Sequence, residues 1–134
     1  MATLSDAQIA FVRDNPFVGV LTNLRPDGSP HSSVVWVDAD DSGISVNTAH
    51  GRAKPRNVAL DGRVALLVVN PGNPYQWVSL NGTGTLSDDG ADTQIDKLAK
   101  KYLGEDVYPW RAEGERRVAI RISPSRVESQ GIEE

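Results

Sequence analysis

The stretch from residue 75 to residue 86 constrains the fold of this chain more than any other feature. It alternates residue types as a strand does over much of its length, and Gly82 and Gly84 interrupt it. Interior glycines weaken a flat strand, but they suit the bends and bulges that a barrel needs at its corners. This long strand therefore indicates a strongly curved sheet.

Five further stretches have strand character, and turn residues separate them. Residues 25–30 combine prolines with Asp-Gly, which predicts a tight turn between two antiparallel strands. Residues 40–43 turn the chain again, so the first three strands are expected to form a meander. The six expected strands cover residues 17–24, 31–38, 44–48, 63–69, 75–86 and 116–124, with 126–129 as a candidate continuation.

Three short helices are expected outside the sheet. Ser5 and Gln8 have the spacing of a capping box for the first helix. The second is expected to start between Arg52 and Lys54, where Pro55 is tolerated, and the third to run from the signal at 87–89 to Gly104.

Antiparallel meanders interrupted by helices are better closed as a barrel than left with exposed edges. We therefore predict a mainly β (α+β) fold, a six-stranded antiparallel β-barrel with short peripheral helices. Residues 1–134 are expected to form one domain, because 134 residues suit a single core and no linker is apparent.

Composition excludes several classes of protein. The net charge of −4 argues against nucleic acid as the main partner. The chain has no cysteine, so it has no disulfide, no thiolate nucleophile and no zinc or iron–sulfur centre built on thiolates, and we predict no metal site. It shows neither a signal peptide nor the roughly 20 apolar residues of a membrane helix, so we expect a soluble cytoplasmic protein without a membrane partner.

Residues 48–57 form a strand-to-helix corner that favours an anion. Arg52, Lys54 and Arg56 lie at the start of the expected helix, where the macrodipole is already positive. Free helix N–H groups, the Thr48 hydroxyl, an arginine fork and a lysine charge together would make a phosphate site. The alternative is a basic first turn that is merely solvated.

Three pieces of the sequence resemble the split β-barrel flavin and deazaflavin proteins related to pyridoxamine 5'-phosphate oxidase. The resemblance spans residues 17–122 and is closest to the actinobacterial branch that uses the deazaflavin coenzyme F420. The three pieces are residues 19–22 with 27–30, residues 48–57 running into 61–65, and residues 80–84.

The resemblance implies a split barrel and a set of cofactor-binding residues. The positions that match the phosphate and adjoining chain of the cofactor are Thr48, Arg52, Ala53 and Lys54, and Asn57 ends the same block. The positions along the cofactor ring are Ser32, Ser33, Val34 and Val35. In a homodimer, the neighbouring subunit would contribute Tyr75 and Trp77.

The resemblance also implies an oxidoreductase that transfers a hydride from reduced F420 to a small organic acceptor. The chain is shorter than the vitamin B6 oxidases and lacks their C-terminal substrate-binding segment, so oxidation of pyridoxamine phosphate is not expected. The alternatives are an FMN-dependent oxidoreductase of the same fold, a non-catalytic deazaflavin carrier, and a structural barrel dimer. No catalytic residue is assigned, because His31 and His50 flank a turn and a strand end, where exposed histidines are ordinary. Trp36 could line the pocket, and Trp110 is expected to cover a barrel end.

Overall fold

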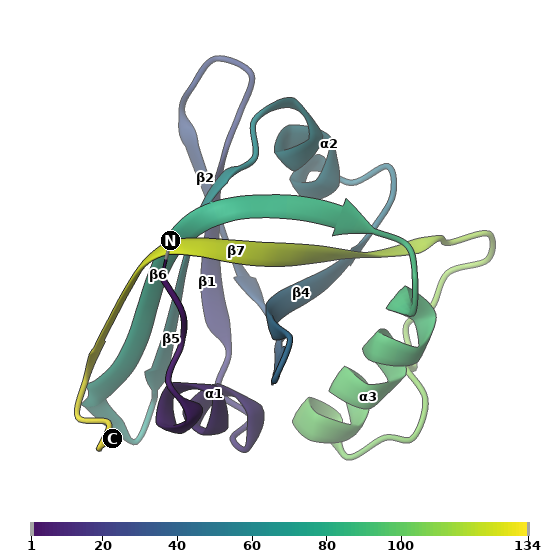
Figure 1. The fold of residues 1–134 in the computed structure, drawn as a ribbon. Coiled ribbons are helices and arrows are strands. Elements are labelled where there is room, and N and C mark those ends of the chain that lie inside the picture. Colours follow the sequence, from purple (N-terminus) through teal and green to yellow (C-terminus); the bar gives the residue numbers. More distant parts are fainter. Residues whose placement is uncertain (1, 134) are drawn as a thin grey trace.

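The computed structural model describes residues 2–133 as one curled antiparallel sheet with three helices (Figure 1). None of the helices in this range is long and apolar enough to cross a membrane. The elements are α1 (Asp6–Arg13), β1 (Gly19–Leu24), β2 (Pro30–Val35), β3 (Val37–Asp40), β4 (Gly43–Ala49), α2 (Ala53–Leu60), β5 (Arg63–Asn70), β6 (Asn73–Ser87), α3 (Ala91–Leu103) and β7 (Arg117–Gln130).

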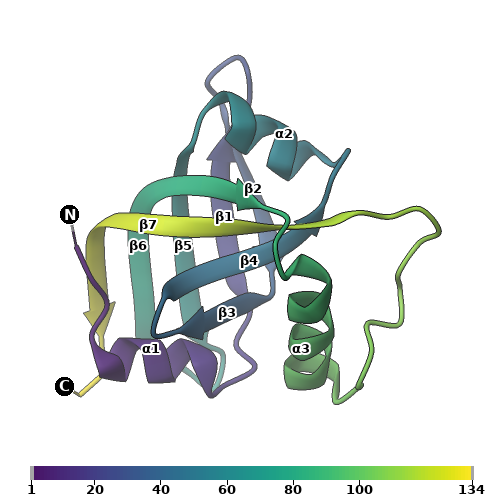
Figure 2. The same cartoon turned by 45° about the vertical axis from the view of Figure 1, so that its right-hand side comes forward.

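The two longest strands make the sheet curl. In the strand order β2-β1-β5-β6-β7-β4-β3, β6 and β7 lie at the centre and pair with each other from Trp77 to Ser87 (Figure 2). Their register shifts between Asn81 and Gly82, and a side chain at position 82 would collide with the carbonyl oxygen of Ser123. The predicted bend is therefore a β-bulge that only glycine fits. The predicted continuation over 126–129 belongs to β7.

The predicted fold class and both hairpins of the predicted meander are confirmed, but residues 2–133 contain seven strands instead of six. The expected strand over residues 31–38 divides at Trp36 into β2 and β3, so seven strands form instead of six. β2 pairs only with β1, whereas β3 pairs with β4, and the two lie at opposite edges of the sheet. An alternating pattern shows which face a residue takes but not which strand it pairs with. β3 covers β4 only as far as Val46, so the barrel is split between the free edge of β2 and the part of β4 that follows Val46.

The helices begin and end largely as predicted. The capping box of α1 is present in both directions, with Ser5 Oγ accepting from Gln8 N at 3.1 Å and Gln8 Oε1 accepting from Ser5 N at 2.8 Å. The helix α3 ends at Gly104 in the left-handed conformation, as expected, but its N-cap is Gly90 and makes no side-chain hydrogen bond. Figure 1 shows α1 and α2 at opposite ends of the curled sheet.

The concave face of the sheet forms the core. Inward-facing residues of β1, β5 and β6 pack with those of β4 and β7, and α1 covers one end through Ile9 and Val12. The largest fully buried side chains include Leu21, Leu66, Leu80, Leu98 and Ile120.

One buried side chain in β1 works against stability. Asn23 is 0% exposed, and within residues 2–133 neither its Nδ2 nor its Oδ1 has a hydrogen-bond partner. We expect Asn23→Val to raise the free energy of unfolding by about 1 to 3 kcal/mol, because it removes an unsatisfied buried amide from a strand. Chemical denaturation of both proteins measures the difference.

Asn47→Val is the matched control, and its effect should have the opposite sign. Asn47 Oδ1 accepts from Arg117 Nε at 2.9 Å, and its Nδ2 donates to Ala91 O and to Gln94 Oε1, each at 2.9 Å. Its loss leaves the Nε–H of the buried Arg117 guanidinium without its acceptor and removes the two hydrogen bonds of Asn47 Nδ2 as well. If Asn23→Val instead destabilises the protein, an internal water satisfies that amide.

Candidate functional site

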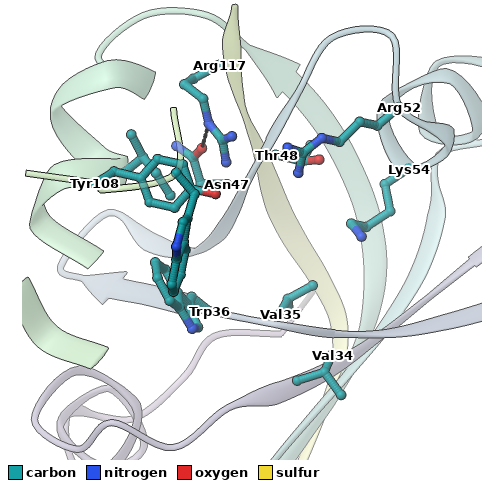
Figure 3. A pocket seen from close by; sticks show the side chains of 11 residues that line it. Val34, Val35, Trp36, Asn47, Thr48, Arg52, Lys54, Tyr108 and Arg117 are labelled. Atoms are coloured by element: carbon teal, nitrogen blue, oxygen red, sulfur yellow. Dashed lines mark hydrogen bonds between the residues drawn. The ribbon is translucent and has the colours of Figure 1, made fainter. Parts of the chain in front are cut away.

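A cavity of about 190 Å³ opens at the split in the barrel (Figure 3). It lies between the end of β2, the end of β4 and the start of α2. Arg52, Lys54 and Thr48 lie on one side, and the aromatic side chains lie on the other together with Arg117. The lining residues are Val34, Val35, Trp36, Asn47, Thr48, Arg52, Lys54, Ile95, Tyr108, Trp110 and Arg117.

The cationic side of the cavity carries positive charge with little compensation. Arg52 is the N-cap of α2 and provides no side-chain hydrogen bond to the helix. The first N–H groups of α2, at the positive end of the helix dipole, therefore have no side-chain cap. Lys54 Nζ donates to Ser33 Oγ at 3.1 Å, and in the described part of the chain it has no carboxylate partner. Burial, and secondly the charge of Arg52, lower the pKa of Lys54. An anion bound beside Lys54 would stabilise its charged form and so offset both the burial and the repulsion from Arg52.

The hydroxyl of Thr48 lacks a partner on the same side. Thr48 is 1% exposed, and its Oγ1 forms no hydrogen bond within residues 2–133. A buried hydroxyl without a partner costs about 1 to 3 kcal/mol, so its retention beside two cations indicates a ligand acceptor at this point. The unpartnered hydroxyl of Thr48 is thus the strongest evidence that the cavity binds a ligand.

A buried ion pair supports the floor of the cavity. Arg117, whose side chain is 3% exposed, donates to Glu115 Oε1 at 2.7 Å and to Asn47 Oδ1 at 2.9 Å. Glu115 Oε2 also lies 3.5 Å from Arg52 Nη2. Burial alone would raise the pKa of Glu115, but the hydrogen bond from Arg117 and the nearby positive charges outweigh it and hold that pKa below its ordinary value. Glu115 is therefore ionised at neutral pH.

The opposite side of the cavity is a cluster of aromatic rings. Trp36 stacks on Tyr102 with ring centroids 5.3 Å apart and meets Tyr108 edge-on at 6.0 Å. Trp110 packs against both Trp36 and Tyr108, and it remains 63% exposed. Trp110 therefore lines this cavity from a largely exposed position on the loop after α3.

Five of the eleven predicted site residues line the cavity. They are Val34, Val35, Thr48, Arg52 and Lys54, and Ser33 joins them through its bond to Lys54. Ala53 is the exposed first residue of α2, and Asn57 is buried without lining the cavity. Arg56 is exposed and does not line it either, so only Arg52 and Lys54 of the three predicted cations lie at the cavity.

The remaining predicted residues lie on the convex face of the sheet. Ser32 bonds Thr22 across the β1–β2 pair, Oγ to Oγ1, at 2.9 Å. Tyr75 and Trp77 are on β6, which two strands separate from β2. At the usual strand spacing that separation is roughly 14 Å, so neither aromatic reaches the cavity of its own chain.

Reasoning from the sequence missed Asn47, Arg117 and Glu115. β4 and β7 pair so that Ala49 lies opposite Arg117, which brings the start of β7 to the cavity. No local pattern in the sequence indicates that pairing. Of the two histidines, His50 pairs with Asp88, and His31 Nδ1 is buried without a partner among the described residues.

The chain matches the family described as pyridoxamine 5'-phosphate oxidase over residues 4–131. It belongs to that family. The split sheet and the cavity beside α2 are thus those of a member of the pyridoxamine 5'-phosphate oxidase family. No curated protein matches the chain.

Several solved structures share the fold. A structure described as an F420 reductase has 26% identity and a TM-score of 0.77, over 89% of this chain and 94% of that one. The conserved hypothetical protein Rv2991 from Mycobacterium tuberculosis has 24% identity and a TM-score of 0.75, over 96% and 85%. HutZ, a heme storage protein from Vibrio cholerae, has 12% identity and a TM-score of 0.68, over 95% of each chain.

The residues of the cavity fit the phosphate group of a cofactor of this family. The buried Thr48 hydroxyl, the Arg52 and Lys54 cations and the uncapped start of α2 all offer donors. No three His, Cys, Asp or Glu side chains gather as metal ligands in the range 2–133. The chemistry available to these residues is anion binding and positioning.

Proposed function

We propose that this protein is an oxidoreductase that uses reduced F420 to transfer a hydride to a small organic acceptor. The observation that carries the proposal is the orphaned Thr48 hydroxyl beside Arg52 and Lys54, which suits the phosphate of a bound coenzyme. The likeness to an F420 reductase at 26% identity supports the choice of F420. A single cofactor-binding domain and a cytoplasmic location belong to the same proposal.

The coenzyme would supply the hydride, so the protein needs only to bind and orient it beside an acceptor. Thr48, Arg52 and Lys54 hold the phosphate, with Ala53 and Asn57 in the same segment. A cavity of about 190 Å³ is smaller than the roughly 300 to 1,000 Å³ typical of ligand pockets, so the ring lies outside it. The segment from Ser32 to Val35 is the free edge of the sheet beside the cavity, and it positions the ring there.

The ring then needs a cover, which a second copy of the chain would supply. Val34, Val20 and Leu67 are cross-strand neighbours on the convex face, and they are 68%, 39% and 41% exposed. Tyr75 and Trp77 extend this apolar face on β6. We therefore propose a homodimer in which each site receives these two aromatics from the partner, through the same surface on both subunits.

Titration with F420 and, separately, with FMN tests the proposal, with the fluorescence of the cofactor ring as the readout. FMN is the second candidate because the cavity residues recognise a phosphate, which both cofactors present. Preference for F420 supports the proposal, and preference for FMN replaces it with a flavin enzyme of the same fold. Tight F420 binding without oxidation by any acceptor indicates a carrier. Binding of neither cofactor leaves only the structural dimer.

The affinity for F420 should fall as pH rises through the lowered pKa of Lys54. A bound anion favours the ammonium form, so binding takes up a proton wherever Lys54 is neutral in the free protein. Dissociation constants measured between pH 7 and 10 give the profile. Lys54→Arg should lose this dependence, because arginine stays charged over the whole range. A profile shared by both proteins would place the titrating group elsewhere.

A further inference from the structure

We propose that Glu115 is a built-in counter-anion of the phosphate site, which a bound phosphate displaces from Arg52 and which limits the affinity of the site. This inference rests on the proposed function in that the ligand brings its phosphate to Arg52. It assigns Glu115, which lies outside the predicted binding segment 48–57, a role in setting the affinity of the site.

Glu115 contacts Arg117 more closely than Arg52, as expected of a counter-anion that a ligand can displace from Arg52. Its side chain is 7% exposed, and one oxygen lies 2.7 Å from Arg117 Nη1 while the other lies 3.5 Å from Arg52 Nη2. Arg117 is 3% exposed and is also held by Asn47 and by the ring of Tyr108, 5.0 Å from its guanidinium carbon. The pair with Arg117 is therefore fixed, and the contact with Arg52 is the one that can open.

Arg52 has the freedom to exchange partners. Its side chain is 51% exposed, and a long ion pair to an exposed arginine contributes little stability. A phosphate that receives the guanidinium fork together with the N–H groups of α2 forms shorter, charge-assisted bonds. Exchange of Glu115 for phosphate on Arg52 is thus favourable, and it leaves the buried Arg117 neutralised.

Glu115 reduces the excess positive charge that a bound phosphate meets. Arg52, Lys54 and Arg117 bring three positive charges to the cavity, and Glu115 brings one negative charge against them. Once phosphate binds, the carboxylate stays beside it and repels it. Glu115 therefore keeps the site from binding anions as tightly as its cations alone would, and this favours release of the coenzyme after reaction.

The test compares Glu115→Gln with Glu113→Gln, an exposed residue of the same loop. Glutamine can still accept from Arg117 but removes the negative charge. We expect Glu115→Gln to bind F420 more tightly, on the order of tenfold for one neighbouring unit charge, while the ligand-free protein unfolds at a lower temperature. Glu113→Gln should match the parent in both. A purely structural ion pair predicts lower stability with weaker binding, and equal or weaker F420 affinity overturns the proposal.

A second probe separates this inference from the choice of cofactor. Inorganic phosphate should raise the unfolding temperature of Glu115→Gln by more than that of the parent, and an equal or smaller rise overturns the proposal. If neither protein binds F420, the proposed function fails and the phosphate result alone decides the role of Glu115. If Glu115→Gln does not fold, Glu115→Asp takes its place. The shorter side chain keeps its charge beside Arg117 but gives up the contact with Arg52, so it relieves the competition for Arg52 and not the repulsion. Its phosphate affinity should then exceed that of the parent, by less than the roughly tenfold gain expected when the charge is removed, and an affinity no higher contradicts the inference.

Discussion

Lys54→Ala is expected to weaken F420 binding roughly 10- to 150-fold, since a charge-assisted hydrogen bond to phosphate contributes about 1.5 to 3 kcal/mol. The unfolding temperature of the ligand-free protein should not fall. Lys54 is a partly buried cation beside Arg52 whose one hydrogen-bond partner is a serine hydroxyl, so its loss removes a repulsion as well as a contact. Fluorescence titration and thermal unfolding measure the two effects.

Arg56→Ala is the matched control for Lys54→Ala. It removes one positive charge from the same helix, but Arg56 is exposed and does not line the cavity. Its F420 affinity should stay close to that of the parent. If both variants lose affinity equally, the general positive potential of α2 attracts the ligand and Lys54 makes no specific bond. If Lys54→Ala binds like the parent, the phosphate lies elsewhere.

Leu67→Glu is expected to convert the proposed dimer into a monomer and to abolish F420 binding. Leu67 lies on β5, between Val20 and Val34 on one side and β6, which carries Tyr75 and Trp77, on the other, and it faces away from the core. An obligate interface should bury upwards of roughly 2,000 Å², and a carboxylate without a partner at its centre costs several kcal/mol. Light scattering at micromolar concentration gives the mass, and titration gives the affinity.

Val107→Glu controls for the introduction of a charge at an exposed apolar residue. Val107 is 61% exposed in the loop after α3, away from the convex face, so this variant should stay dimeric and keep its affinity. A Leu67→Glu monomer that still binds F420 tightly would contradict the shared site. A Leu67→Glu dimer would show that subunits associate through another surface.

Local signals in the sequence determined the parts of the fold that neighbouring residues control. The Ser5 to Gln8 capping box, the tight turn before Pro30 and the end of α3 at Gly104 each depend on residues close in the chain. The bulge at Gly82 also follows from a local property, because only glycine admits the close approach of β7. Each of these was predicted correctly.

One side of the candidate site also consists of residues that are close in the chain. Thr48, Arg52 and Lys54 lie within seven consecutive residues, and a strand-to-helix corner is enough to bring them together. The sequence nevertheless did not show which of the clustered cations face the cavity. Arg56 belongs to the same basic cluster, but it lies outside the cavity. Which of the three cations face one another depends on how α2 packs on the barrel.

Only the tertiary structure decided where the barrel opens and what completes the site. The chain changes partner strands at Trp36 within a continuous apolar run, residues 34–37, in which no turn residue marks the change, and that change produces the split. Arg117 and Glu115 reach the cavity because β7 pairs with β4 across about 70 residues of chain, and Tyr108 and Trp110 arrive on the loop before it. The periodicity of a strand shows which side of the sheet each residue faces. Which strands pair depends on how the whole sheet packs across the barrel, and that packing exists only in the folded chain.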